Sequence, residues 1–214
     1  MKLNNKRTIL VGLAFLSICA FWQMYDSIVP LILTKTFHMN ETFSGAIMAA
    51  DNILALFLLP FFGSVSDKSH SKLGKRMPFI LFGTGCAIIL MNILPLLDNS
   101  YAAQPSGFKT ASFVIVLGLL LVAMGTYRAP AVALMPDVTP KPLRSRANAI
   151  INLMGAVGGI LYLGVAAVLY PNSKTAGLDH VNYQPLFIVV SAIMFVAVAV
   201  LFLTIREPKL TAEN

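Results

Sequence analysis

The chain has 214 residues, of which 57% are apolar and only 12% charged, and its formal net charge is +7. A soluble globular domain carries about 25% charged residues, so this composition excludes an ordinary soluble domain. The net positive charge does not indicate nucleic-acid binding either, because the basic residues lie in short loops and no predicted element would present them to DNA.

The apolar residues are gathered into six blocks, each about the 20 residues that a helix needs to cross a bilayer. The blocks are 8–33, 43–65, 78–97, 112–135, 147–170 and 185–205. They lack the period-two alternation of a membrane β-barrel. We therefore predict an all-α membrane protein in which residues 1–205 form one bundle of six transmembrane helices. Residues 206–214 are expected to be a cytoplasmic tail or the start of a linker.

Lysine and arginine are divided unevenly between the two sides that six spans define. Twelve lie in the termini and in the loops on the same side as the termini. The opposite side has three, namely Lys35, Lys109 and Lys174. The positive-inside rule therefore predicts that both termini are cytoplasmic. The longer outer loops, 98–111 and 171–184, are polar and nearly neutral.

The first and fourth spans share a local pattern of a tyrosine, one charged residue and then a proline. Tyr25 and Asp26 precede Pro30, and Tyr127 and Arg128 precede Pro130. These spans would be the first members of two three-helix units, the second inverted relative to the first. Inverted repeats with interrupted helices at matching places are typical of the binding region of a transporter. A separate pattern, Gly155 and Gly159, predicts close approach of the fifth span to another helix.

Three ionisable residues lie inside predicted spans: Asp26, Asp51 and Arg128. Each costs at least about 2.5–3.5 kcal/mol at the centre of a bilayer, so such residues face the bundle interior or a wet cavity. We predict that they form a solute or ion site with polar and aromatic neighbours, although hydrogen bonds that merely join helices are the alternative. The candidate site residues are Trp22, Gln23, Tyr25, Asp26, Asp51, Asn52, Tyr127, Arg128, Asn148 and Asn152.

The predicted site combines groups suited to a hydroxyl-rich solute and to a coupling cation. The planar fork of Arg128 fits sugar hydroxyls or a carboxylate, and Trp22 offers an apolar ring face. Arg128 is expected deeper in the membrane than both acids, so an ion pair with either needs a long reach or a water. We expect no metal centre, because Cys19 and Cys86 match no ligand spacing. With no nucleotide-binding motif and no cofactor expected, the energy source would be an ion gradient of H⁺ or Na⁺.

The stretch "GSVSDKSHSKLGKRMP", residues 63–78, has the frame G-x-x-x-D-K followed by G-K-R. It resembles the signature loop between helices two and three of the major facilitator superfamily. Its inserted "SHSK" is similar to the longer loop of the glycoside–pentoside–hexuronide and sucrose–proton symporter branches. The stretch "YRAPAVALMPDVTPKPLRSRANAIINLMGAVGG", residues 127–159, resembles the same branches.

This resemblance implies a carrier that couples transport of a sugar-like solute to a proton or sodium gradient by alternating access. It also implies that the signature loop belongs to a cytoplasmic gate. The residues expected in this gate are Gly63, Asp67, Lys68, Gly74, Lys75, Arg76, Asp137 and Arg144. We expect an integral protein of a bacterial plasma membrane.

Family members have twelve helices in two six-helix bundles, so the chain is expected to be half of a major-facilitator fold. A lone bundle would leave its polar face against lipid, which predicts a second six-helix half, either another copy or a separate chain. Two alternatives stay open. One is a non-transporting remnant, scaffold or sensor derived from a carrier. The other is an intramembrane aspartyl protease using Asp26 and Asp51, although no motif around either residue supports an enzyme.

Overall fold

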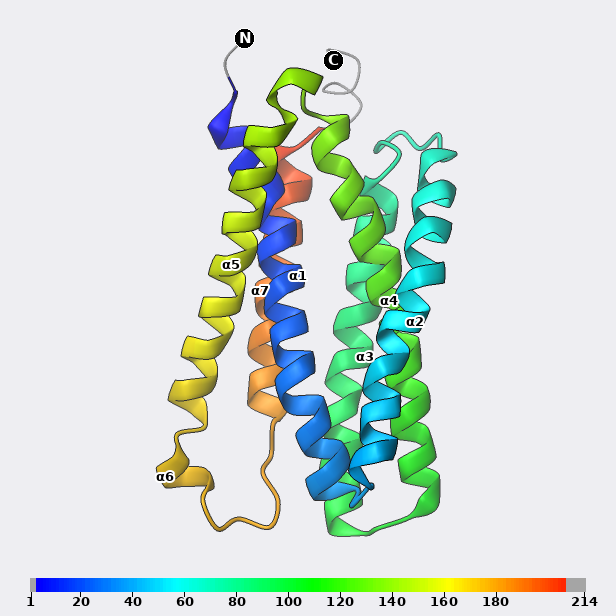
Figure 1. Ribbon diagram of the computed structural model, residues 1–214, viewed down its shortest axis with the longest axis vertical. Coiled ribbons are helices and arrows are strands. Elements are labelled where there is room, and N and C mark those ends of the chain that lie inside the picture. The colour runs from blue at the N-terminus through cyan, green and yellow to red at the C-terminus, as the bar shows by residue number, and fades with distance from the viewer. Residues whose placement is uncertain (1–2, 207–214) are drawn as a thin grey trace.

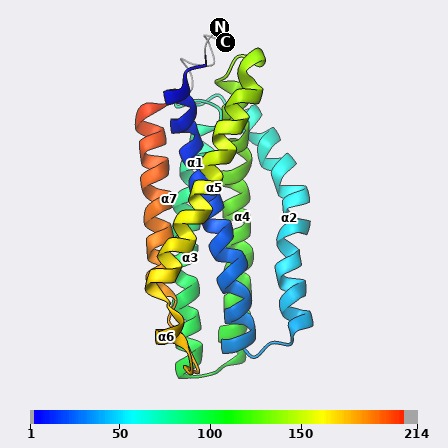
Figure 2. The ribbon, with the colours of Figure 1, turned by 60° about the vertical axis from the view of Figure 1, so that its left-hand side comes forward.

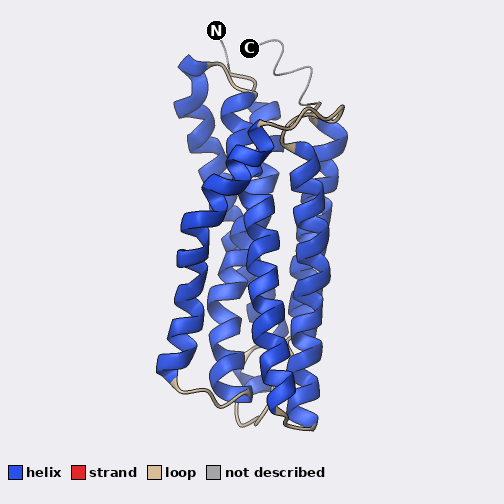
Figure 3. Ribbon diagram, turned by 90° about the vertical axis from the view of Figure 1, so that its right-hand side faces the viewer, coloured by secondary structure: helices blue, strands red, loops and turns tan. Residues whose placement is uncertain are grey.

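The computed structural model describes residues 3–206, which form a bundle of long helices with no β-strand among them (Figures 1 and 3). The elements are α1 (Asn5–Leu31), the π-helical η1 (Ile32–Thr36), α2 (Glu41–Asp67), α3 (Met77–Ala103), α4 (Gly107–Asp137), the 3₁₀ turn η2 (Lys141–Leu143), α5 (Arg144–Leu169), α6 (Asn172–Thr175) and α7 (Gln184–Thr204). Six helices in this part of the chain are long and apolar enough to cross a membrane, which confirms the predicted fold class.

The six predicted spans fall on these helices, and the largest difference lies between α3 and α4. The predicted outer loop 98–111 is wrong, because α3 continues to Ala103 and α4 already begins at Gly107. The polar residues after position 97 stay helical for two physical reasons. No proline follows position 97 until Pro105. The Lys109 ammonium also caps the end of α3 by donating to the carbonyls of Ser100 and Gln104, both at 2.8 Å. Most of the predicted tail, residues 207–214, lies outside the described residues.

The helices form two groups of three (Figures 1 and 2). In one group α1 packs against α5 and α7, and in the other α4 packs against α2 and α3. Exchanging α1 with α4, α2 with α5, and α3 with α7 converts the first set of neighbours into the second. The remaining large contact, between α3 and α7, is unchanged by this exchange. These neighbours are those that two inverted three-helix repeats require, in agreement with the predicted architecture.

Both described ends of the chain lie at one end of the bundle, which we call the terminal end (Figure 1). The loop between α2 and α3 and the turn η2 lie at the same end, whereas α6 lies at the opposite end. This arrangement follows from six consecutive crossings. The core consists of buried apolar side chains, mostly from α1, α3, α4 and α7. In α2, by contrast, the most apolar 18-residue stretch has no buried residue.

Glycines allow the closest helix approaches. At Gly83 of α3, an added Cβ would lie 2.6 Å from the backbone nitrogen of Tyr127 in α4. Between α5 and α1 the tight position is Gly158, where a Cβ would lie 2.0 Å from the carbonyl oxygen of Leu16. The predicted pair Gly155 and Gly159 is therefore only half right. Gly155 lies against the Cys19 thiol, but a Cβ at Gly159 would meet nothing closer than Gln23 Oε1 at 3.8 Å.

We predict that Gly158→Ala lowers the thermal unfolding midpoint of the purified protein, because the new methyl group must push α5 away from the backbone of α1. Gly164→Ala is the matched control, since nothing lies within 4 Å of its Cβ position. The control should leave the midpoint unchanged or raise it, because alanine favours a helix by about 1 kcal/mol over glycine. Circular dichroism melting measures both variants, and equal midpoints would show that α1 and α5 do not pack as described.

Candidate functional site

The guanidinium of Arg128 in α4 lies over the indole of Trp22 in α1. The Arg128 Cζ atom is 5.6 Å from the ring centroid, within the range of a cation–π interaction of about 0.5–2 kcal/mol. Trp22 is itself fixed by edge-to-face contacts with Phe21 and Tyr25, each with ring centroids 5.3 Å apart. Neighbouring aromatic side chains of α1 thus orient the ring that receives the intramembrane cation.

Asp51 of α2 completes this arrangement. It lines a small cavity together with Trp22, Arg128 and apolar residues of α2 and α4. The cavity volume is about 20 Å³, which is room for about one water. Within the described residues no ion pair joins Arg128 to Asp51 or Asp26. Arg128 lies instead on the aromatic face of Trp22.

Asp26 and Asp51 lie close enough to interact electrostatically, although they belong to different helices. The side chains of Asp26 and Gln23 are exposed on the bundle face, whereas Asp51 is half-buried. The Asp51 Oδ1 atom accepts hydrogen bonds from the backbone and side-chain nitrogens of Asn52, at 2.5 and 2.8 Å. No hydrogen bond joins the two carboxyl groups within the described residues.

Two hydrogen-bonding groups beside the acids are buried and have no protein partner. They are the indole nitrogen Nε1 of Trp22 and the hydroxyl of Tyr25. A buried donor without a partner costs about 1–3 kcal/mol, so such groups point to a water or a ligand. Together with Arg128 and the acids they provide donors and acceptors within one region of α1, α2 and α4. A molecule with several hydroxyl groups can form hydrogen bonds with both the donors and the acceptors, because each hydroxyl group can donate and accept.

Tyr127 occupies a different environment from the one predicted for a ligand-binding residue. Its side chain is 0% exposed, and its hydroxyl lies 2.6 Å from Ser17 Oγ and donates to the Ala14 carbonyl at 3.1 Å. It therefore joins α4 to α1 in the packed interior. Asn148 and Asn152 of α5 are exposed, and neither makes a hydrogen bond to the other site residues described. The structure thus brings together the candidates on α1, α2 and Arg128, but not these three.

A second cluster lies at the terminal end and centres on Arg76, the residue before α3, whose side chain is only 6% exposed. Its guanidinium forms ion pairs with Asp67 at the end of α2 and with Asp137 at the end of α4, the latter at 2.9 Å. The same group donates to Ser66 Oγ at 2.5 Å and to the Gly63 carbonyl at 3.2 Å. One arginine therefore holds the ends of three helices together.

The other predicted gate residues surround this cluster in different ways. Gly74 turns the loop with a φ of 114°, a left-handed conformation that favours glycine. Arg144 donates to the carbonyls of Pro136 and Thr139, at 2.7 and 3.2 Å, and so caps the end of α4. The side chains of Lys68 and Lys75 are exposed. The structure thus assembles Gly63, Asp67 and Asp137 around Arg76 and leaves the two lysines at the surface.

A third cluster, at the opposite end, was missed by the sequence analysis. His180, in the segment before α7, lies 3.3 Å from Thr36 Oγ1 and 2.8 Å from Asn99 Oδ1 through its two ring nitrogens. Its Nε2 atom is also 3.9 Å from Oδ2 of Asp98, a carboxyl that is 0% exposed. Asp98 was assigned to a loop because apolar character ends at position 97. The signal that marks it is the absence of a helix breaker between Asp98 and Pro105.

We predict that Arg76→Lys lowers the free energy of unfolding by about 2 kcal/mol, because one ammonium group cannot replace a fork that reaches α2 and α4 at once. The exposed Arg146 at the same end provides the matched control, Arg146→Lys. Thermal melting of both variants tests this. A loss that is equal in the two variants would mean that the described geometry of Arg76 contributes nothing.

A second prediction separates packing from binding at Tyr127. Tyr127→Phe should cost about 0.6–1 kcal/mol of stability, the usual value of one hydrogen bond between membrane helices, and should leave the affinity for any solute unchanged. Melting curves and solute titrations of the same preparation measure the two effects. A loss of affinity without a loss of stability would contradict this prediction and would indicate that Tyr127 belongs to the binding site.

Comparison with known proteins identifies the family to which the chain is similar. Residues 11–214 match the family described as Major Facilitator Superfamily. The chain is 35% identical over 158 residues to the sucrose transport protein SUC3 of Arabidopsis thaliana, which covers 68% of this chain and 26% of that protein. It is 36% identical over 154 residues to the sucrose transport protein SUT3 of Oryza sativa subsp. indica, covering 65% and 30%.

A human relative, solute carrier family 45 member 3, is 25% identical over 186 residues, which covers 85% of this chain and 34% of that protein. The chain thus spans about a third or less of the length of the curated relatives that it matches. The family match covers nearly the whole chain and coincides with the six-helix inverted-repeat fold. The chain is an integral membrane protein that belongs to the major facilitator superfamily.

Proposed function

We propose that the chain is one half of a secondary active transporter for a sugar-like solute. The single observation that carries this proposal is the group of Trp22, Arg128, Asp51 and Asp26 on three neighbouring helices. The relatives named as sucrose transport proteins support the class of solute. The arrangement supports a transporter, because a cation, two carboxyl groups and an aromatic ring on neighbouring helices can bind a polar solute.

The solute would lie against the exposed face rather than inside the bundle. The cavity beside Asp51 and Arg128 has room for about one water, and a disaccharide is far larger. Gln23 and Asp26 are exposed on this face, so they would contact solute hydroxyls directly. Trp22, which is half-buried, would contribute its apolar ring. Arg128 would then act at the edge of the site through its position over that ring.

The proposed coupling ion is a proton or, less favoured, sodium. A proton is favoured because a single carboxyl group can bind and release one. The bundle offers two such groups, Asp26 and Asp51, on the membrane-spanning helices α1 and α2. Sodium would instead require several oxygen ligands, and Asp51 with Asn52 supplies a start of such a set.

A second six-helix half is part of this proposal. Alternating access needs a surface against which the solute-binding face can open and close. The face with Asp26, together with the exposed Asn148 and Asn152, would otherwise meet acyl chains. The Arg76 cluster would be the cytoplasmic part of the gate, with both chain ends in the cytoplasm of a bacterial plasma membrane. A second copy or a separate chain could supply the other half.

We predict that sucrose causes proton uptake in proteoliposomes that contain a tandem fusion of two copies of the chain. The fusion is feasible because both described chain ends lie at the same end of the bundle (Figure 1). Asp26→Asn or Asp51→Asn should abolish proton uptake, because an amide cannot take up the coupling proton. Asp179→Asn, at an exposed position outside the helices, is the matched control and should retain it.

The outcomes separate the alternatives. Sucrose binding without movement of sucrose or protons would favour a remnant, scaffold or sensor. Proton uptake that survives in both Asp26→Asn and Asp51→Asn would show that the coupling acid lies elsewhere. A repeat in a sodium gradient without a pH gradient distinguishes the two cations.

A further inference from the structure

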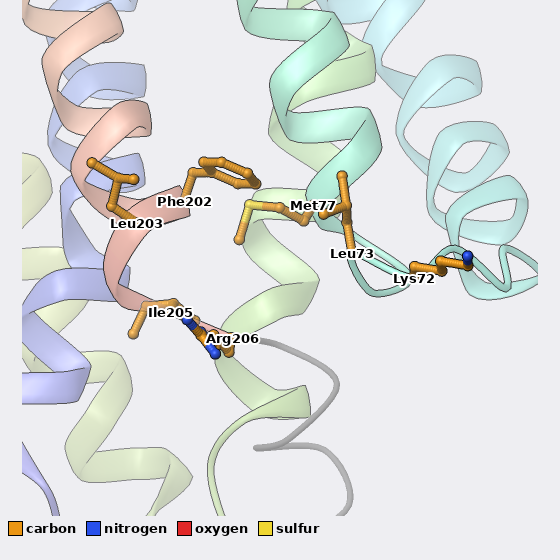
Figure 4. A pocket seen from close by; sticks show the side chains of 7 residues that line it. All are labelled: Lys72, Leu73, Met77, Phe202, Leu203, Ile205 and Arg206. Atoms are coloured by element: carbon orange, nitrogen blue, oxygen red, sulfur yellow. The ribbon is translucent and has the colours of Figure 1, made fainter.

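A groove of about 390 Å³ opens at the terminal end, between the start of α3 and the last turn of α7 (Figure 4). It is lined by Lys72, Leu73, Met77, Phe202, Leu203, Ile205 and Arg206. The ring of Phe202 points toward Met77 across the groove, while Lys72 and Arg206 lie on opposite sides of it (Figure 4). Its volume is in the range of ordinary ligand pockets, about 300–1,000 Å³.

The lining has a distinct chemistry, because the floor is apolar and both charged residues are basic. A second groove, of about 480 Å³, provides a contrast within the same bundle. It lies between α1 and α7 and is lined only by apolar side chains such as Leu13, Ile188 and Val196. That groove can accept acyl chains of any lipid. The groove at the terminal end can also select for negative charge.

The position of the groove decides which anion it would meet. It lies where α3 begins and α7 ends, and therefore at the depth where membrane-spanning helices leave the hydrocarbon core. Lipid head groups occupy this depth, and basic pockets between transmembrane helices bind anionic head groups. Leu203 is 76% exposed, so the apolar side of the groove opens toward the surroundings of the helix, which in a membrane are acyl chains.

The geometry points to a binding site for one anionic glycerophospholipid. The head group is held by Arg206, whose guanidinium can pair with phosphate oxygens through two donors. Lys72, on the opposite side of the groove, adds a second positive charge. The adjoining acyl chain lies along Phe202 and Leu203. This site is separate from the proposed solute site and does not depend on it, because none of the groove residues belongs to the Trp22, Asp51 and Arg128 group.

The site also lies beside the Arg76 cluster. Met77 lines the groove and directly follows Arg76, which pairs with Asp67 and Asp137. Lys72 and Leu73 belong to the same loop. A lipid held between this loop and α7 would therefore restrain the segment that carries Arg76, and it would link the composition of the membrane to the stability of the three helix ends.

The test measures lipid retention by native mass spectrometry of the purified chain. Phosphatidylglycerol and phosphatidylcholine with identical acyl chains are offered in equal amounts. We expect the protein to retain phosphatidylglycerol in preference. In the double variant Lys72→Gln/Arg206→Gln this preference should fall by about thirtyfold, the factor that two basic groups near an anionic lipid surface contribute at about 1 kcal/mol each.

The matched control is Lys35→Gln/Lys174→Gln, which removes the same charge from exposed positions elsewhere and should keep the preference. Both double variants change exposed side chains, so equal melting midpoints confirm that folding is intact. Phe202→Ala should weaken retention of both lipids, because it removes apolar contact rather than charge.

Three results would overturn the assignment. The first is an unchanged preference in Lys72→Gln/Arg206→Gln. The second is displacement of the lipid by glycerol phosphate as effectively as by phosphatidylglycerol, which would indicate a site for a soluble anion. The third is a rise in retained phosphatidylglycerol when the chain is ended at Arg206, which would assign the groove to residues 207–214.

Discussion

A bilayer cannot hydrate a guanidinium group, and this constraint organises the centre of the bundle. Arg128 lies within the membrane-spanning helix α4, and the guanidinium group of an arginine carries a positive charge in proteins. The free-energy cost of placing this charge in the membrane is reduced by two neighbours. One is the face of the Trp22 ring. The other is the carboxylate of Asp51, which lies across a cavity with room for about one water. Those contacts require α1, α2 and α4 to meet at this depth. The packing of Gly83 and Gly158, which brings α3 to α4 and α5 to α1, supports the same arrangement.

The two ends of the bundle show how an inverted repeat reuses one plan with different chemistry. At the terminal end, Arg76 precedes α3 and pairs with Asp137 at the end of α4. The exchange that relates the repeats converts α3 to α7 and α4 to α1. At the opposite end, His180 precedes α7 and contacts Thr36 at the end of η1, which continues α1. In both clusters a nitrogen-rich side chain precedes the third helix of one repeat, which is α3 or α7. This side chain contacts the end of the first helix of the other repeat, which is α4 or α1 with its continuation η1.

The chemical difference between the clusters has a physical consequence. Arginine is always charged, so the links from Arg76 to Asp67 and Asp137 persist while these acids are ionised. His180 instead contacts the neutral side chains of Thr36 and Asn99 and lies 3.9 Å from the fully buried carboxyl of Asp98. The terminal end is therefore held by an arginine paired with two carboxylates, and the opposite end mainly by hydrogen bonds to neutral groups.

The sequence was sufficient for the fold but only partly for the site. Hydropathy finds all six spans because the bilayer imposes their length, and the shared tyrosine–charge–proline pattern identifies the inverted repeat. The same reasoning misplaces Asp98, because hydropathy detects where apolar character ends rather than where the helix ends. It predicts that Gly159 lies at the contact between α5 and α1, but in the structure Gly158 lies there. A pattern of small residues does not determine the rotation of a helix to within one position.

The side-chain environments needed coordinates. Tyr127 and Tyr25 look alike in sequence, each beside a charged residue. Only the structure shows that the Tyr127 hydroxyl has partners on α1, whereas the Tyr25 hydroxyl has none. The sequence identifies Trp22 and Arg128 separately as candidates, but their contact depends on how α1 and α4 are rotated against each other.

The central claim is that Trp22 lies beside Arg128 on a hydrated face rather than against acyl chains. Trp22 is the single tryptophan of the chain, so its fluorescence reports this directly. In bilayers, the account predicts that aqueous iodide quenches Trp22 strongly, that Arg128→Gln weakens this quenching by removing the adjacent cation, and that brominated acyl chains quench it little. Strong quenching by brominated chains, together with iodide quenching that does not depend on Arg128, would contradict it.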